Sequence, residues 1–310
     1  MSDAIPLSRE RPILPSPRSA LRARLINLGS TGVVLGVHGL CLLTPFVALS
    51  WRIAAISAGC YVLQVLGITA GYHRYFSHRA FRTSRIFQFV LAWLGCSAMQ
   101  NGPLWWASGH RRHHRFSDKP GDPHSPVLGG FWHAHLGWVL DGSNDHPDLS
   151  NVRDFTGFVE LRLLDEWKWV PTLVTGVASV LLFGWPGLVW VFGVATTLAF
   201  HAPLFVNSLG HLRGRQRFET NDSSRNNALL GVLVLGEGWH NNHHHAQGLA
   251  RHGLAWWEID VTYYAIRALQ LVRVVWCVRE PGARVARDTS GRRVSRASPA
   301  SPSATATGFR

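Results

Sequence analysis

The sequence predicts an all-α membrane protein with four transmembrane helices, one interfacial helix and a cytosolic helical cap that carries a histidine-rich site. Three observations support this fold class. Uncharged stretches of twenty or more residues recur along the chain, and polar segments rich in histidine separate them. The mean hydropathy is only +0.04. A sizeable polar part must therefore lie outside the bilayer.

The N-terminal part of the chain contains a basic arm and two apolar runs. Residues 1–24 are rich in Pro, Ser and Arg and are expected to form a flexible cytosolic arm, with no cleaved signal peptide. Two uncharged runs, Leu25–Trp51 and Ile53–Tyr72, follow. Each is long enough to cross a hydrocarbon core of about 30 Å. They predict spans near 28–50 and 53–73.

Two further uncharged runs complete the expected membrane part. Ile86–Gly109 contains Asn, Gly, Pro and paired Trp residues, which predicts an embedded segment over 86–109. Trp169–Leu212 is divided at Gly184-Trp-Pro-Gly187, which predicts spans near 168–184 and 187–207. The membrane domain is expected to cover 25–278, with residues 115–168 ordered in the cytosol. Residues 279–310 are expected to form a disordered basic tail.

The charge pattern predicts the orientation and excludes some functions. Several arginines flank the first pair of spans on one side and only Arg52 lies on the other, which predicts that both termini and the polar core are in the cytosol. The net charge is +13. A soluble nucleic-acid binder would lack the apolar runs, so no nucleic-acid partner is expected. The basic surface suits membrane lipid or a phosphate-bearing substrate. The four cysteines show no paired spacing, which argues against disulfides or a zinc ribbon.

Histidines carry the functional prediction, because many of the 17 are clustered. Two triplets have the spacing i, i+3, i+4, which places three side chains on one helical face. His73 and His78 are five residues apart. Asn207 and His211, at i and i+4, follow at the end of the last predicted span. The candidate metal ligands are His73, His78, His110, His113, His114, Asn207, His211, His240, His243 and His244.

Nine imidazoles can converge only if they lie on one side of the membrane. His73 and His78 follow the second span and the last triplet follows the fourth span. Two and four crossings lead to the same side of the membrane, so these histidines can meet. The segment before His110 must then enter the membrane without crossing it. Nine imidazoles exceed what one metal needs, which favours two metals. Imidazole suits iron, zinc, copper and nickel alike, so the ligands do not choose the metal.

The remaining histidines are expected to have structural roles. His38 and His201 lie inside predicted spans as satisfied polar groups, and His133 and His135 are expected to be structural. His124 is expected to support a ligand or a turn. His245 is expected to be spare, and His252 to be a surface residue.

At these positions the sequence resembles the membrane fatty acyl desaturases, and within them the stearoyl-CoA (Δ9) branch. The resemblance covers about residues 25–271 and excludes both tails. The motifs that carry it are Gly67-Ile-Thr-Ala-Gly-Tyr-His73-Arg-Tyr-Phe-Ser-His78, Gly109-His110-Arg-Arg-His113-His114, Asp122-Pro-His-Ser125, Gly130-Phe-Trp-His-Ala-His135-Leu-Gly-Trp138, Asn207-Ser-Leu-Gly-His211, Ser224-Arg-Asn-Asn227 and Gly236-Glu-Gly-Trp-His240-Asn-Asn-His243-His244.

The resemblance implies a diiron centre with two Fe ions per chain and no catalytic side chain beyond the metal ligands. It implies a fatty acyl substrate, acyl-CoA first, and a separate electron-donor protein. One iron would be held by His73, His114, His211, His240 and His244. The other would be held by His78, His110, His113 and His243, with Asn207 acting through water. A Phe-Pro pair common in the family after the last motif is missing, which leaves local substrate contacts open.

Alternatives remain at this stage. A hydroxylase or ketolase could use the same scaffold, and a non-redox membrane metal protein, such as a zinc hydrolase or a metal-storage protein, could use the same ligands. The acyl carrier, the double-bond position and the chain length are also open. The chain-length preference is expected to be set in the second span, on the helical face of His73, by Leu66, Thr69 and Ala70.

Overall fold

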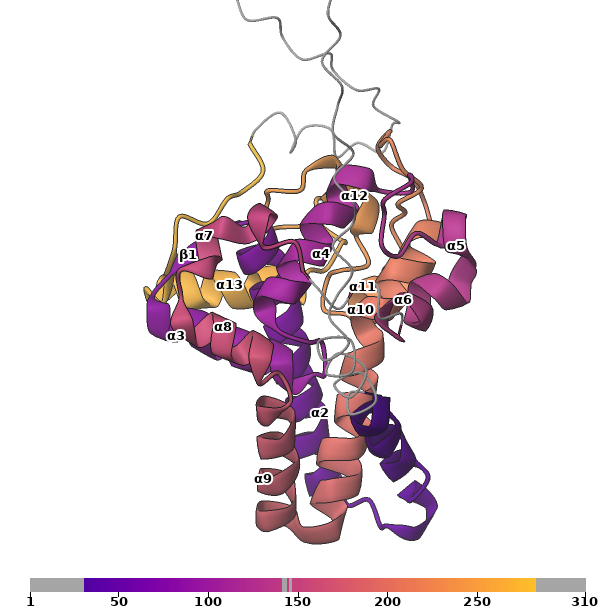
Figure 1. Ribbon diagram of the computed structural model, residues 1–310, viewed down its shortest axis with the longest axis vertical. Helices are drawn as coiled ribbons and strands as arrows, with labels where there is room; N and C mark the ends of the chain where they lie inside the picture. The colour runs from indigo at the N-terminus through magenta and orange to yellow at the C-terminus, as the bar shows by residue number, and fades with distance from the viewer. Residues whose placement is uncertain (1–30, 141–143, 145–146, 283–310) are drawn as a thin grey trace, which may run out of the picture.

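The computed structural model describes residues 31–140, 144 and 147–282. It consists of a narrow helical stalk below a broader cap (Figure 1). The expected arm 1–24, the start of the first span and most of the basic tail lie outside the described residues. In the described part, the strands β1 (Arg82–Thr83) and β2 (Val275–Trp276) form one antiparallel pair, so the predicted all-α class holds apart from this ribbon.

The helical elements follow in chain order. They are η1 (Thr44–Phe46), α2 (Trp51–Leu66), η2 (Gly67–Ser77), α3 (Arg85–Ser97), α4 (Pro103–Phe116), α5 (Pro126–Trp132), η3 (His133–Gly137), α6 (Trp138–Leu140), η5 (Leu149–Val152), α7 (Arg153–Thr156), α8 (Val159–Glu166), α9 (Val170–Pro186), η6 (Gly187–Val194), α10 (Ala195–Leu212), α11 (Ala228–Leu233), α12 (His240–His245) and α13 (Val261–Leu271).

The stalk contains the apolar helices. Within the described residues, Trp51–Ser77 and Val170–Leu212 are long and apolar enough to cross a membrane. The second stretch folds back on itself at Gly184, whose φ of 61° only glycine adopts readily, so η6 packs against α9 and leads into α10 (Figure 1). The apolar segment Thr31–Phe46 is shorter. These helices support membrane association, and the arrangement of four spans stays a prediction.

The helix that begins as α2 changes its winding in its upper half. From Gly67 to Ser77 it is a π-helix, with i→i+5 hydrogen bonds that widen each turn by about one residue. All eleven residues of η2 are buried. The close packing against α3 requires small residues, because a Cβ on Gly67 would come within 2.5 Å of the Leu94 backbone. The π-helix therefore rotates the chain as it enters the cap.

The expected embedded segment 86–109 is two helices rather than one. α3 has 13 residues and is about 20 Å long, too short to cross the bilayer, and it lies across the top of the stalk (Figure 1). The chain then breaks, with Met99 and Asn101 both at φ 59°. α4 begins at Pro103, where the Asp165 carboxylate accepts from the backbone N–H of Leu104 (3.1 Å). The break redirects the chain so that α4 enters the cap.

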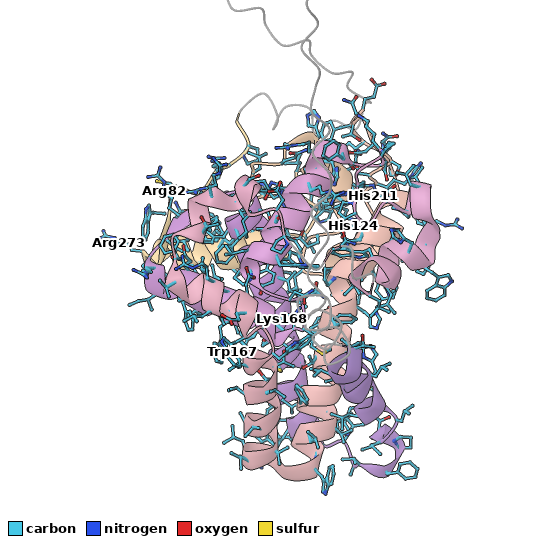
Figure 2. The ribbon with its side chains drawn as sticks, in the orientation of Figure 1. Arg82, His124, Trp167, Lys168, His211 and Arg273 are labelled. Atoms are coloured by element: carbon cyan, nitrogen blue, oxygen red, sulfur yellow. The ribbon has the colours of Figure 1, made fainter. Side chains whose placement is uncertain are left out.

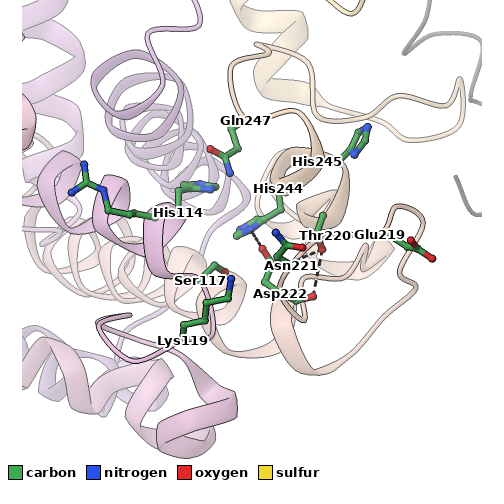
Figure 3. Close-up of a pocket in the computed structure, with 11 residues that line it drawn as sticks. His114, Ser117, Lys119, Glu219, Thr220, Asn221, Asp222, His244, His245 and Gln247 are labelled. Atoms are coloured by element: carbon green, nitrogen blue, oxygen red, sulfur yellow. Dashed lines mark hydrogen bonds and ion pairs between the residues drawn. The ribbon is translucent and has the colours of Figure 1, made fainter. Parts of the chain in front are cut away.

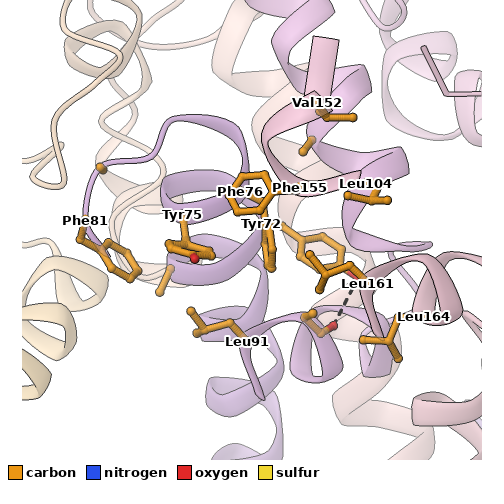
Figure 4. Packing of buried hydrophobic residues seen from close by; sticks show 14 of the residues in the cluster. Tyr72, Tyr75, Phe76, Phe81, Leu91, Leu104, Val152, Phe155, Leu161 and Leu164 are labelled. Carbon is orange, nitrogen blue, oxygen red and sulfur yellow. Dashed lines mark hydrogen bonds between the residues drawn. The ribbon is translucent and has the colours of Figure 1, made fainter. Parts of the chain in front are cut away.

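The cap has an aromatic core between η2, α3 and the α7–α8 segment. Tyr72, Phe76, Phe155 and Leu161 are buried there and face one another (Figure 4). The rings of Phe76 and Phe155 pack edge to face with centroids 5.0 Å apart. This core fixes η2 against α4 below the polar centre. Trp167 and Lys168 lie where cap and stalk meet, whereas His124 and His211 lie higher in the cap (Figure 2).

Candidate metal centre

The nine histidines of the predicted site converge from four parts of the chain. His73 lies in η2 and His78 directly follows this helix. The other seven histidines lie in α4, α10 and α12. Their ligand atoms form two groups, each with all atoms within 4.8 Å of one another. The first group is His73, His78, His110, His114 and His243, and the second is His113, His211, His240 and His244.

The first group has the geometry of a metal cage. His110 Nε2 lies 3.0 Å from His78 Nε2 and 2.9 Å from His114 Nε2. His243 Nε2 lies 2.9 Å from the Nε2 atoms of both His73 and His114. An imidazole nitrogen has one hydrogen or one lone pair, so it cannot make good hydrogen bonds in two directions. Adjacent ligands around one metal with bonds of about 2.1 Å lie about 3.0 Å apart, which matches these contacts.

The second group offers a similar set of nitrogen donors. The Nε2 atoms of His211 and His240 are 3.0 Å apart. The Nε2 atoms of His113 and His244 are buried and have no hydrogen-bond partner among the described residues. Buried polar atoms of this kind are costly unless something satisfies them. A metal bound by all four Nε2 atoms would satisfy them together.

The division between the two groups differs from the one that the resemblance implied. His73 and His114 lie with His243 rather than with His211, and His113 lies in the other group. The reason is helical spacing, because residues at i and i+4 share a face. His110 and His114 therefore point to one group, and His240 and His244 to the other. The residue next to each pair, His113 or His243, points across to the neighbouring group.

Four carboxylates hold the histidines from behind through Nδ1. Asp122 contacts His113 at 3.0 Å, Asp118 contacts His211 at 2.9 Å, and Asp222 contacts His244 at 2.7 Å. Glu237 contacts His73 at 2.5 Å. An Nδ1–H that donates to a carboxylate leaves Nε2 free for a metal and fixes the ring orientation. The sequence reasoning assigned no role to these carboxylates, because their positions depend on loops that fold back over the helices.

The three aspartates are ionised in this arrangement. Burial alone would raise the pKa of Asp118, Asp122 and Asp222, but their histidine partners lower it well below the usual range. Serine hydroxyls add to the effect at Asp118, which accepts from Ser125 and Ser223, both at 2.6 Å. Each ionised carboxylate favours the Nδ1–H tautomer of its histidine, the form that presents Nε2 to a metal.

Arg74 and His252 form a second buried support behind the first group. The Arg74 side chain is 0% exposed and contacts Asp260 at 3.0 Å and Glu237 at 3.2 Å. It also donates to His252 Nδ1 at 3.1 Å. His252 is 1% exposed, so its prediction as a surface residue is wrong. Arg74 follows the second predicted span and lies inside the protein, where it pairs with Asp260 and contacts Glu237, a carboxyl whose pKa burial raises to about 8.

His124 and His245 lie outside the two histidine groups of the centre, as expected. His124 is buried and its ring lies 4.3 Å from that of His113. His245 is exposed and stacks on Phe218, with centroids 4.1 Å apart. Asn207, expected near one metal, lines an apolar cleft together with His73 and His240. The structure therefore brings all ten predicted site residues to one place in the cap.

Comparison with known proteins agrees with this centre. Residues 48–271 match the model of the fatty acid desaturase family. The chain belongs to this family. It is 38% identical to the palmitoyl-monogalactosyldiacylglycerol delta-7 desaturase of Arabidopsis thaliana, over 83% of this chain and 70% of that protein. It is equally similar to an acyl-CoA 5-desaturase of Anemone leveillei, over 80% and 78%. It is 37% identical to delta-9 acyl-lipid desaturase 2 of Arabidopsis thaliana, over 79% and 80%.

Family membership confirms the expected oxidoreductase and its place in lipid metabolism. The desaturase has two openings at its histidine centre. One is a polar cavity of about 280 Å³ that reaches His114 and His244 and is lined by Arg115, Lys119 and Asp222 (Figure 3). The other is a narrow apolar cleft of about 20 Å³ between α2, η2 and α10, where Val65, Ile68 and Val206 lie beside His73 and His110. The centre is therefore open to a polar and to an apolar environment.

The residues of the second predicted span that line the cleft of this desaturase differ in part from the expected ones. Thr69 lines the cleft, as expected, but Leu66 and Ala70 do not, and Val65 and Ile68 do. The π-helix explains the change, because its wider turns bring residues four, five and eight positions before His73 onto one face. An α-helix would have placed the residues three, four and seven positions before it there.

The carboxylates behind the desaturase centre predict the effect of a conservative change. Asp222→Asn is expected to lower metal affinity, measured by chelator competition, by about 10–100-fold, because the neutral amide holds His244 less firmly. Glu219→Gln, in the wall of the same cavity, is the matched control and should bind metal as the wild type does. Wild-type affinity in Asp222→Asn would show that the carboxylate does not support the centre.

Proposed function

We propose that this chain is a dioxygen-dependent fatty acyl desaturase that introduces a cis double bond, with the Δ9 position of an acyl-CoA as the first substrate to test. The observation that carries the proposal is the position of two histidine groups beside an apolar cleft. Relatives of this chain are named for acyl-lipid and for acyl-CoA substrates. Either carrier brings a long apolar chain to the centre.

The proposed cofactor is a pair of iron ions. One would be held by His73, His78, His110, His114 and His243, and the other by His113, His211, His240 and His244. Asn207 lines the cleft beside members of both groups and would act through water. Iron with dioxygen supplies the oxidising power that an unactivated methylene requires. The chain supplies nitrogen donors and the carboxyl groups that orient them. No cysteine belongs to either group, which argues against a structural zinc site.

The role proposed for the cleft is to position the acyl chain. Val65, Ile68, Val206 and Val234 give it an apolar wall, and His73 and His110 also line it. An apolar chain gains free energy by leaving water for such a wall. Because the wall belongs to packed helices, it fixes the depth of the chain and hence which carbon atoms reach the histidines. Electrons would come from a separate protein.

The proposed topology is multi-pass, with four spans, both termini in the cytosol and the centre on the same side. The Arg distribution supports this orientation. The fold-back at Gly184 also supports it, because it returns α10 and His211 to the side from which α9 started.

Expression in a host of defined lipid composition tests the proposed function. Mass spectrometry of the host fatty acids should show new monounsaturated species, and purified active protein should contain about two irons per chain. Hydroxylated or keto products instead of alkenes would favour the hydroxylase or ketolase alternative. Zinc without iron in an active preparation would contradict the diiron proposal and favour a non-redox metal protein.

The cleft predicts where chain length is set. Val65→Trp or Thr69→Phe is expected to shift products toward shorter chains at an unchanged double-bond position, because packed interiors do not absorb added volume freely. The matched control is Leu63→Trp, on the same helix but 54% exposed. The measurement is the product profile of each variant in one host. The wild-type chain-length profile in active cleft variants would place the end of the acyl site elsewhere.

A further inference from the structure

The cap helix α11 exposes apolar side chains. Leu229, Val232 and Leu233 are each more than half exposed. Leu230 is instead buried in a core cluster that also contains residues of α2 and α10. The helix therefore has apolar side chains on its buried and on its exposed side. A helix that is apolar all round is expected inside a protein or in contact with a membrane, and water is an unfavourable surrounding for it.

Three hydrogen bonds place the end of α11 at the level where the stalk meets the cap. The Tyr61 hydroxyl of α2 donates to the Leu233 carbonyl. Gln64, one turn further along α2, donates to the carbonyl of Ser97, and Thr172, in the first turn of α9, donates to the carbonyl of the residue just before it, both at 3.0 Å. The end of α11 and the start of α9 are therefore at a similar height. Because α9 is one of the proposed spans, α11 lies at the membrane boundary.

Helix α13 extends this apolar surface. It lies across the cap rather than along the stalk (Figure 1). Its first turn is held close to the end of α11, because the backbone N–H of Thr262 donates to the Leu235 carbonyl at 2.9 Å. Tyr264 and Leu271 are exposed and, seven residues apart, share one helical face. Trp256, shortly before α13, is 89% exposed, and Trp is enriched where membrane and water meet.

The charges of this region suit a lipid surface. The acidic residues from the start of α11 to the end of β2 are all buried, namely Glu237, Glu258 and Asp260. The exposed charged side chains of the same stretch are Arg267 and Arg273. Arg273 lies at the same edge of the cap as Arg82 (Figure 2). Anionic headgroups attract such arginines, whose stems can lie along apolar surface while the charge stays in water.

We infer that α11 and the exposed face of α13 lie in the cytosolic leaflet, where lipid acyl chains contact their apolar side chains. Lipid is favoured over a protein partner because the surface continues the stalk, where Leu63 of α2 is also exposed. Helices of this kind lie in the plane of the membrane boundary. Directly after α11, Val234 lines the apolar cleft, so the leaflet contact borders the proposed acyl site. The inference rests on the proposed membrane crossing of the stalk and is independent of the reaction.

Single cysteines that carry an environment-sensitive nitrobenzoxadiazole dye can test this contact. The background lacks the three native cysteines that are not fully buried. The test positions are Val232→Cys and Leu271→Cys. Leu181→Cys, exposed on α9 in the stalk, is the lipid control. Glu219→Cys, exposed in the wall of the polar cavity, is the water control. All four positions lie outside the ten proposed site residues, and equal metal content is verified first.

The experiment places the full-length, metal-loaded proteins in nanodiscs of phosphatidylcholine and phosphatidylglycerol. Quenching of the dye by doxyl-labelled phosphatidylcholine is compared with quenching by iodide. Val232→Cys and Leu271→Cys should be quenched severalfold more by the labelled lipid than by iodide, as Leu181→Cys should be. Glu219→Cys should show the reverse order.

Two results at the test positions would overturn the inference while Leu181→Cys behaves as expected. Stronger quenching by iodide, as at Glu219→Cys, would show that this face meets water. Protection from both quenchers would show that a second copy or another part of the chain covers it. Stronger quenching by iodide at Leu181→Cys as well would contradict the proposed topology together with the inference, so the two failures are distinguishable.

Discussion

His243→Ala is expected to abolish double-bond formation, with a loss well beyond the about 10–100-fold typical of residues behind a metal ligand. His243 is the link between His73 and His114, because its Nε2 lies 2.9 Å from the Nε2 of each. Its removal opens the proposed first metal site on the side where three ligands meet. The measurements are product yield in a defined host and iron content of the purified protein.

His245→Ala provides the matched control for this substitution. His245 is two residues further along the same helix, is exposed, and stacks on Phe218 rather than facing the groups. It should retain substantial activity and full iron content. Membrane insertion should be the same in both variants, because α12 lies outside the apolar helices. Equal inactivity of the two variants, both inserted, would show that the register of the last histidine triplet is wrong.

Arg74→Ala is expected to have the largest effect on stability, with a loss of about 3–5 kcal/mol. The Arg74 side chain is fully buried and lies between Asp260 and Glu237. Its removal would leave the buried Asp260 carboxylate without a cation and Glu237 without a hydrogen-bond donor. Asp260 also anchors the backbone N–H of His252 at 2.7 Å and caps α13 at Tyr263, so the loop behind the first histidine group should loosen as well. Thermal unfolding of the purified protein measures the loss.

Arg79→Ala is the control for Arg74→Ala. Arg79 lies five residues further on and pairs with Asp154, but its side chain is 51% exposed. Exposed ion pairs contribute little, so this variant should unfold close to the wild type. Arg74→Lys should fall between the two, because lysine keeps the positive charge but lacks the guanidinium whose Nη2 contacts both Asp260 and Glu237. Similar unfolding of Arg74→Ala and Arg79→Ala would show that the buried network is not a main support.

Much of the site could be predicted from local spacing. The triplets at i, i+3 and i+4 in α4 and α12 predicted convergence, and the structure brings these residues together with His73, His78 and His211. The break at Gly184 was also marked by Gly and Pro in the sequence, whereas the break after Ser97 was not predicted. These features depend on a few neighbouring residues, so they can be recognised without knowledge of the rest of the chain.

Other features depend on segments that are distant in the chain. Asp118 reaches His211 across 93 residues, and Arg74 reaches Asp260 across 186. No spacing rule relates such pairs. The same limit explains the wrong prediction for His252, whose neighbours in sequence are polar but whose ring lies 4.4 Å from that of His243. The same limit explains why Leu66 was wrongly expected to line the cleft. The π-helical winding of η2, which turns Leu66 away, is stabilised by packing against α3 and α4.

The sequence by itself determined the helical class, the apolar stretches and the ten residues of the candidate centre, because hydrophobic length and helical periodicity are local properties of a chain. Only the tertiary structure decided which histidines share a group, which carboxylates orient them and which residues line the cleft. Those outcomes depend on the relative rotation of packed helices. A change of winding within η2 or a break before α4 turns each helix by a large angle, and no local pattern records where the neighbouring helix then lies.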